Sequence, residues 1–139
     1  MSNRVRLGLD LFSVRSQGWD AFQFLDYASK LGVEVVHFSE IRFFGSLEEA
    51  HLRKVKARAD QLGLSLEAGM TSICPTSKRF NPADGTAEQQ ITRMLGVAKL
   101  VGSPIVRCFL GSSADRPIEP HIESTVRVLR AARSRIVDA

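Results

Sequence analysis

Three glycines divide the chain into a repeating pattern. Gly32, Gly63 and Gly102 each follow a stretch in which apolar residues recur at helical spacing, and each precedes a short run that is largely apolar. Glycine commonly ends a helix because it adopts a left-handed backbone conformation without steric cost. The pattern predicts four strands alternating with four helices, which is typical of a parallel sheet with right-handed crossovers.

The positions of the strands and of the first helix follow from this spacing. We expect strands over residues 5–12, 33–40, 64–70 and 104–111, and a first helix over about 19–31. The apolar face expected for that helix is Trp19, Phe22, Leu25, Ala28 and Leu31.

The other helices carry recognisable start signals. A capping box, in which a Ser or Thr is followed three residues later by Glu or Gln, predicts the start of a helix at Ser46 and again at Thr86. The last helix is predicted to begin near Pro120, because the first helical turn tolerates the missing N–H of proline. Its expected apolar face is Ile122, Val126, Leu129 and Ile136.

Each expected strand contains an ionisable side chain: Asp10, His37, Glu67 and Arg107. Strands of a parallel sheet are covered on both faces and usually read as continuous apolar runs, and burying an unpaired charge is costly. Because side chains alternate along a strand, each strand keeps one purely apolar face and has a polar residue on the other. Counted from the helix-ending glycines, His37, Glu67 and Arg107 are expected at similar heights in the sheet.

This polar layer favours a barrel over an open sheet. Polar side chains near the C-terminal ends of parallel strands are typical of a barrel with its active site at that mouth, and the connections after the strands are the long ones. An open nucleotide-binding sheet would carry GxGxxG after its first strand, where this chain has DLFSVRSQG. The sequence predicts an α/β fold, the (β/α)4 half of a TIM (β/α)8 barrel, as a single domain over 1–139. The alternative is a buried salt-bridge network that only stiffens the interior, with Glu67 and Arg107 as its central pair.

Several residues outside the strands are also candidates. Residues 78–81 could close over an anionic or polyol substrate or form a solvated loop, and Ser112 and Ser113 could offer backbone N–H groups to an oxyanion. Cys74 and Cys108 are expected to be reduced thiols, because they show neither a CxxC nor a zinc-like arrangement.

Composition excludes several classes of protein. With 139 residues, of which 44% are hydrophobic, the chain can bury a core, and we do not expect disorder. The sequence has no apolar run long enough to cross a membrane and no signal-peptide centre, so we expect a cytoplasmic protein. The net charge of +4 is a weak indication of polyanion binding. The densest basic stretch, 127–135, lacks interleaved aromatic residues, so we expect a solvated helix face and no nucleic-acid partner.

Four stretches of sequence resemble a known family. They are VVHFSE, EAGMTSICPTSKRFNP, GTAEQQITRMLGVAKLVGSPIVRCFLGS and HIESTVRVLRAAR, and they are similar to the first half of the sugar phosphate isomerase/epimerase family, the xylose-isomerase-like TIM barrels. The resemblance implies interconversion of hydroxy-ketones and aldehydes, or of epimers, by proton transfer beside a carbonyl, with a divalent metal (Mn, Mg, Zn or Co) at the barrel mouth. His37, Glu67 and Arg107, and behind them Asp10 and Glu40, are the expected residues that bind the sugar or polyol. His37 stands where many members carry a glutamate, and no general base is assigned.

The chain differs from this family in length. Members are about twice as long, in keeping with roughly 250 residues for the fold, and the family's metal ligands come from strands five to eight. His51 and His121 are expected on the surface, so we expect no complete metal site and no activity from this chain alone. Either the chain is part of a longer protein, or two copies form a homodimer that closes the barrel, because a lone half-barrel leaves two strand edges unpaired. An apurinic-site endonuclease-like hydrolase and a non-catalytic binding or assembly module are the alternatives.

Overall fold

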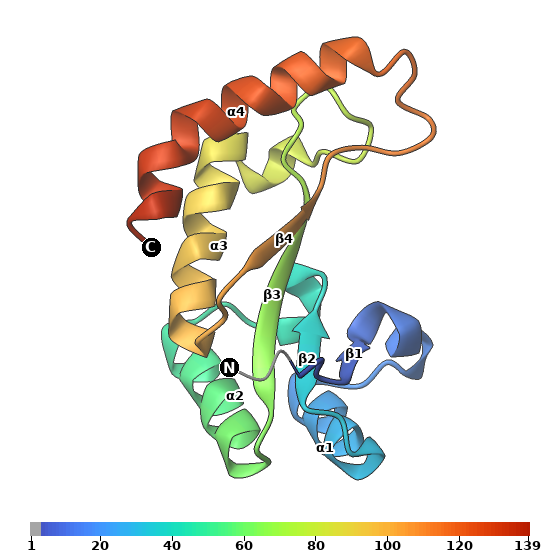
Figure 1. Cartoon of the computed structure of the whole chain (residues 1–139), viewed down its shortest axis with the longest axis vertical. Coiled ribbons are helices and arrows are strands. Elements are labelled where there is room, and N and C mark those ends of the chain that lie inside the picture. Colours follow the sequence, from blue (N-terminus) through green and yellow to red (C-terminus); the bar gives the residue numbers. More distant parts are fainter. Residues whose placement is uncertain (1–3) are drawn as a thin grey trace.

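A computed structural model describes residues 4–139. Its strands form one sheet in which every neighbouring pair is parallel and the order follows the chain, β1-β2-β3-β4. Figure 1 shows β3 running through the middle of the molecule. The strands are β1 (Gly8–Asp10), β2 (Val35–Phe38), β3 (Ser65–Ser72) and β4 (Val106–Phe109). The predicted alternation of parallel strands and helices is therefore confirmed.

Within residues 4–139, four α-helices and three short 3-10 helices lie between the strands or after the last one. The α-helices are α1 (Ala21–Leu31), α2 (Glu49–Gln61), α3 (Ala87–Val101) and α4 (Glu119–Val137), and the 3-10 helices are η1 (Leu11–Gln17), η2 (Ile41–Phe44) and η3 (Pro82–Asp84). Within residues 4–139, none of the helices is long and apolar enough to cross a membrane.

One of the two predicted capping boxes is present. Thr86 accepts a hydrogen bond from the backbone N–H of Gln89, whose side chain accepts one in return from the N–H of Thr86. The box at Ser46 is wrong: α2 begins at Glu49 with Glu48 as its N-cap, and the Ser46 hydroxyl accepts from the Glu48 N–H instead. Ser46 thus forms a local turn before the helix, the competing use of a Ser side chain.

The first strand is shorter than predicted. Residues 11 and 12 belong to η1, because the carboxylate of Asp10 accepts a hydrogen bond from the N–H of Phe12 at 2.9 Å and caps that 3-10 helix. The same side chain that marks the end of β1 therefore also turns the chain away from the sheet.

The hydrophobic core lies between the sheet and its helices. From β2 and β3 it includes Val36, Phe38, Leu66 and Ala68, all on one face. Phe38 stacks on Phe44 of η2 with ring centroids 4.4 Å apart. Burial of this size, roughly 1.5–3 kcal/mol for each large side chain, makes this face the main source of stability.

The predicted apolar face of α1 is confirmed at Leu25 and Ala28 and wrong at Leu31, and the predicted apolar face of α4 is wrong. In α1 the buried residues include Phe24, Leu25 and Ala28, whereas Leu31 is exposed, because a spacing of three drifts around a helix with 3.6 residues per turn. In α4 the buried residues are Thr125 and Ala132. The predicted apolar face of α4 is exposed: Ile122 54%, Val126 38%, Leu129 41% and Ile136 41%.

The position of α4 explains its exposed face. The helix lies along α3 and stands away from β4 (Figure 1). A groove with a volume of about 460 Å³ separates α4 from β4. Its lining residues include Ile91, Leu95, Val106, Cys108, Leu129 and Ile136. The helix-facing side of β4 is therefore only partly covered.

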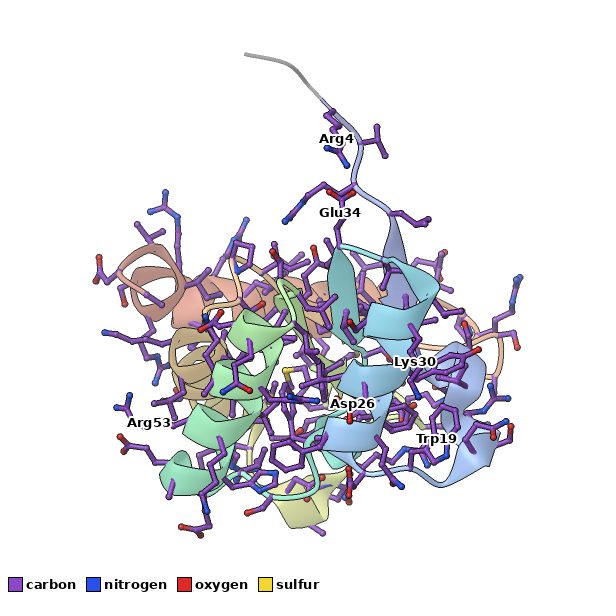
Figure 2. All side chains as sticks on the ribbon, turned by 90° about the horizontal axis from the view of Figure 1, so that it is seen from below. Arg4, Trp19, Asp26, Lys30, Glu34 and Arg53 are labelled. Atoms are coloured by element: carbon purple, nitrogen blue, oxygen red, sulfur yellow. The ribbon has the colours of Figure 1, made fainter. Side chains whose placement is uncertain are left out.

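At the N-terminal end of the sheet, Arg4 pairs with Glu34 at 2.8 Å. Figure 2, which views the molecule from that end, shows these two side chains together and Arg53 pointing outward from α2. Neither the Arg4–Glu34 pair nor Arg53 belongs to the polar layer formed by Asp10, His37, Glu67 and Arg107.

Candidate functional site

Three of the predicted polar side chains form one row across the sheet. Asp10 is the register partner of His37, and His37 is the partner of Glu67. Arg107 pairs with Gly69, two residues beyond Glu67 on the same face of β3. All four side chains therefore share the face opposite the helices. The expectation of similar heights is confirmed for His37 and Glu67, whereas Arg107 lies two residues further along the sheet.

Arg107 joins the side chains of this row. Its Nε donates a hydrogen bond to Nε2 of His37 at 3.2 Å, and its Nη2 lies 3.6 Å from Oδ2 of Asp10. Nδ1 of His37 lies 3.3 Å from Oε2 of Glu67. We call Asp10, His37, Glu67 and Arg107 the polar quartet; each of its members comes from a different strand.

The polar quartet is partly open to solvent. The exposed fractions of the side chains are 14% for His37, 28% for Glu67, 32% for Arg107 and 40% for Asp10. The four side chains are therefore partly buried and not sealed from water.

Hydrogen-bonding capacity is left over in and beside the polar quartet. Because Nε2 of His37 accepts from Arg107, the ring proton lies on Nδ1, which faces Glu67 without hydrogen-bond alignment. Nη1 of Arg107 and the hydroxyl of Ser39 are also buried without a partner in the described protein. An unmade hydrogen bond of this kind costs about 1–3 kcal/mol, so a hydroxyl-rich ligand that reached these atoms would recover part of that cost.

Two exposed aromatic rings border the polar quartet. Phe12 follows β1 and carries the guanidinium of Arg15 3.9 Å above its ring, and Phe109 at the end of β4 carries that of Arg107 at 4.3 Å. Such cation–π pairs contribute about 0.5–1 kcal/mol at exposed sites. The sequence signal for Phe109 is its spacing of two from Arg107, which puts both on one face.

Glu40, the fifth predicted site residue, has a different partner. Its carboxylate pairs with Nε of Arg42 on η2. The structure therefore brings four of the five predicted residues together and ties Glu40 to the neighbouring loop.

Asp115 connects the two long loops at the same end of the sheet. Its carboxylate accepts hydrogen bonds from the N–H of Lys78 at 2.8 Å, the hydroxyl of Ser77 at 2.8 Å and the N–H of Ser112 at 2.7 Å. The Lys78 N–H, then the Ser77 hydroxyl and the Ser112 groups, hold the pKa of Asp115 well below its ordinary value, against the opposing effect of burial. Because the Ser112 N–H is used here, it is not free for the oxyanion role considered from the sequence.

The two remaining histidines make specific contacts. Nε2 of His51 lies 2.7 Å from the carbonyl oxygen of Phe44. Nδ1 of His121 lies 2.7 Å from the hydroxyl of Thr76 and 3.9 Å from Sγ of Cys74. Both histidines, expected on the surface, are partly exposed. His121 makes its contacts because the loop after β3 packs on the first turn of α4.

The polar quartet does not fit a divalent metal. Within residues 4–139 there is no group of three or more His, Cys, Asp or Glu side chains placed to hold one. Asp10, His37 and Glu67 are neighbours, but the Arg107 guanidinium engages the first two and puts a positive charge where a cation would have to bind.

Comparisons with known proteins agree with the fold. No family model matches the sequence, and no curated protein matches it significantly. Among solved structures, a crystal structure of D-psicose 3-epimerase, determined in the presence of D-fructose, superimposes with a TM-score of 0.72 at 12% sequence identity. The match covers 96% of this chain and 49% of that chain, so this chain spans about half its length.

The class of structure follows from this match. The chain has the fold of one half of a TIM barrel, as its sequence predicts. At this identity the likeness is evidence for the fold alone.

Proposed function

We propose that the chain forms the substrate-facing half of a sugar or polyol isomerase or epimerase. The observation that carries this proposal is the polar quartet itself, in which one ionisable side chain from each strand gathers around Arg107. The face that these side chains share is the one a barrel encloses, and barrel enzymes bind substrate at the C-terminal ends of such strands. The fold similarity to half of a D-psicose 3-epimerase supports a sugar as the substrate class.

Each member of the polar quartet suits part of a sugar. Arg107 and His37 offer N–H donors to hydroxyl or carbonyl oxygens, while Asp10 and Glu67 accept hydrogen bonds from hydroxyl groups. Loss of a proton from a carbon beside a carbonyl develops negative charge on the carbonyl oxygen, and the guanidinium stabilises that charge. We assign no general base within these residues, and the exposed ring of Phe109 provides an apolar surface for the C–H face of the substrate.

The proposal includes a second (β/α)4 unit that closes the pocket. Leu7 beside β1, and Ile105 and Leu110 beside β4, are apolar yet 62%, 47% and 57% exposed. Edge strands with unpaired backbone groups and apolar neighbours are natural sites for further pairing. A continuation of the chain or a second copy of it would supply the missing strands.

Sedimentation velocity of the 139-residue chain distinguishes these sources. A species of twice 15.4 kDa that is lost in Leu110→Lys supports a second copy. The matched control is Leu31→Lys, because Leu31 is 49% exposed but lies on α1, away from β4. A monomer at every concentration would leave only a chain continuation as the source of the second unit.

Binding of D-fructose tests the proposed function. We expect a titration followed by amide NMR to shift the signals of Gly69 and Cys108, which flank the polar quartet. Arg107→Lys removes the planar guanidinium, and a charged hydrogen bond worth about 1.5–3 kcal/mol predicts weakening by roughly tenfold or more. The matched control is Arg53→Lys, because Arg53 pairs with Glu49 on α2 and points outward from that helix (Figure 2).

Two results would argue against the proposal. The first is a titration in which no amide on this face moves, and the second is equal weakening by both Arg→Lys changes. A purely structural role of Arg107 would instead appear as a lower urea midpoint. Ion pairs this exposed contribute about 0–1 kcal/mol, so we expect that midpoint to change little.

A further inference from the structure

Cys74 lies in a small polar cluster outside the polar quartet. It follows β3, its side chain is fully buried, and its S–H points to the carbonyl oxygen of His121 in the first turn of α4 at 3.5 Å. The hydroxyl of Thr76 lies 3.3 Å from Sγ and the His121 ring 3.9 Å from it. Thr76 is exposed and His121 partly exposed, so the sulfur lies directly beneath the surface.

One buried hydroxyl group in this cluster has no hydrogen-bond partner within the described residues. Thr125 on α4 is 5% exposed, and its hydroxyl has no partner in the described protein while the thiol is neutral. The same hydroxyl contributes to the lowered pKa of the Cys74 thiol. A buried donor without a partner beside a sulfur indicates a site arranged for a negative charge on that sulfur.

The two cysteines differ in acidity for clear physical reasons. Burial raises the pKa of the Cys74 thiol, but hydrogen bonds more than offset this increase and lower the pKa to about 7. These hydrogen bonds come from the side chains of Thr76 and Thr125, the backbone of Thr76 and the ring of His121. Burial in the apolar groove raises the pKa of Cys108, and the nearby charge of Arg107 opposes this only in part.

We propose that Cys74 is a modification site, a thiolate that a small hydroperoxide oxidises to a sulfenic acid. The thiolate sulfur attacks the terminal peroxide oxygen, and a sulfur–oxygen bond forms as the oxygen–oxygen bond breaks. Hydroxide leaves from hydrogen peroxide, or alkoxide from an organic hydroperoxide, and water protonates it. Sulfur loses two electrons and the peroxide gains them. Oxidation also adds an oxygen atom to a fully buried sulfur that lies 3.5 Å from the His121 carbonyl oxygen, so it loosens the contact between the loop after β3 and the start of α4.

A comparison within one molecule tests the proposal. At pH 7 a thiol with a pKa near 7 is about half thiolate, against about 1% for a pKa of 9, a ratio of roughly 50. Lower basicity reduces nucleophilicity by about six- to tenfold over this range, which leaves Cys74 at least about fivefold faster than Cys108. Native protein treated with hydrogen peroxide and a sulfenic-acid trap, then mapped by mass spectrometry, should carry the adduct mainly on Cys74. Modification of the more exposed Cys108 first, or of both equally, would overturn the proposal.

A second measurement does not depend on access to the buried sulfur. The ultraviolet absorbance of the thiolate in Cys108→Ser reports Cys74 alone, and we expect a midpoint near pH 7. Thr125→Val should move that midpoint upward, while Thr92→Val on the exposed face of α3 should leave it unchanged. A midpoint at or above 9 in Cys108→Ser would refute the thiolate, and it remains informative even if Thr125→Val does not fold.

Discussion

Gly69→Ala tests the close packing of β2 and β3 beside the polar quartet. A Cβ atom at position 69 would lie 2.6 Å from the carbonyl oxygen of Ser39 and 2.9 Å from both its Cα and its carbonyl carbon. All three are backbone atoms directly after β2, so no side-chain rotation relieves the contact. The chain at Ser39 has to move away from β3.

The cost follows from this overlap. Forcing one extra carbon into a well-packed site costs typically about 1–3 kcal/mol, and domains of this kind are stable by only about 5–15 kcal/mol. The matched control is Gly96→Ala in α3, where an added Cβ meets no atom within 4 Å. There the higher helix propensity of alanine should stabilise the protein by about 1 kcal/mol.

Urea unfolding followed by circular dichroism measures both variants. With a slope of about 1–3 kcal/mol per molar urea, we expect the midpoint of Gly69→Ala to fall by roughly 1 M and that of Gly96→Ala to rise. The movement of β2 also separates His37 from Glu67, so D-fructose binding should weaken in Gly69→Ala alone. An unchanged or higher midpoint in Gly69→Ala would show that β2 and β3 do not approach as closely as described.

Three further changes have defined outcomes. Asp115→Asn should lower the urea midpoint at pH 6. The folded-state pKa of Asp115 is depressed, so its stabilisation is present above its unfolded pKa of about 3.9 and is lost as the pH falls through the lower folded value. The difference in midpoint between wild type and variant should therefore shrink towards pH 2. Thr86→Ala should cost about 1 kcal/mol in urea unfolding because it removes an N-cap, whereas Ser46→Ala, outside the helix it precedes, should cost clearly less. Phe38→Ala should cost about 3–5 kcal/mol, against less than about 1 kcal/mol for the half-exposed Ile122→Ala, and equal costs would contradict the described burial.

Local signals in the sequence were sufficient for much of the fold. The glycines after α1 and α3 end their helices with φ of 69° and 68°, and the Thr86 capping box begins α3 as predicted. These signals act over a few residues and do not depend on the rest of the chain. Ser46 shows their limit, because the same residue pattern also stabilises a turn that precedes the helix.

The sequence predicted which side chains form the polar quartet but not how they contact one another. Period-two alternation put Asp10, His37, Glu67 and Arg107 on one face, since that depends only on strand geometry. The register between β3 and β4 places Arg107 opposite Gly69, two residues beyond Glu67. This register and the pairing of Glu40 with Arg42 depend on how neighbouring segments pack. The Asp115 and Cys74 clusters each join residues about 40 positions apart, and no local pattern marks them.

The sequence by itself determined the order of strands and helices and the polar face of the sheet, because backbone conformation and side-chain alternation are set by each residue and its near neighbours. Only the tertiary structure decided which face of α4 is buried, since the helix packs along α3 and leaves Ile122 and Leu129 exposed. It also decided that the guanidinium of Arg107 reaches His37 and Asp10. Both outcomes depend on distances between segments far apart in the chain, which residue spacing does not encode.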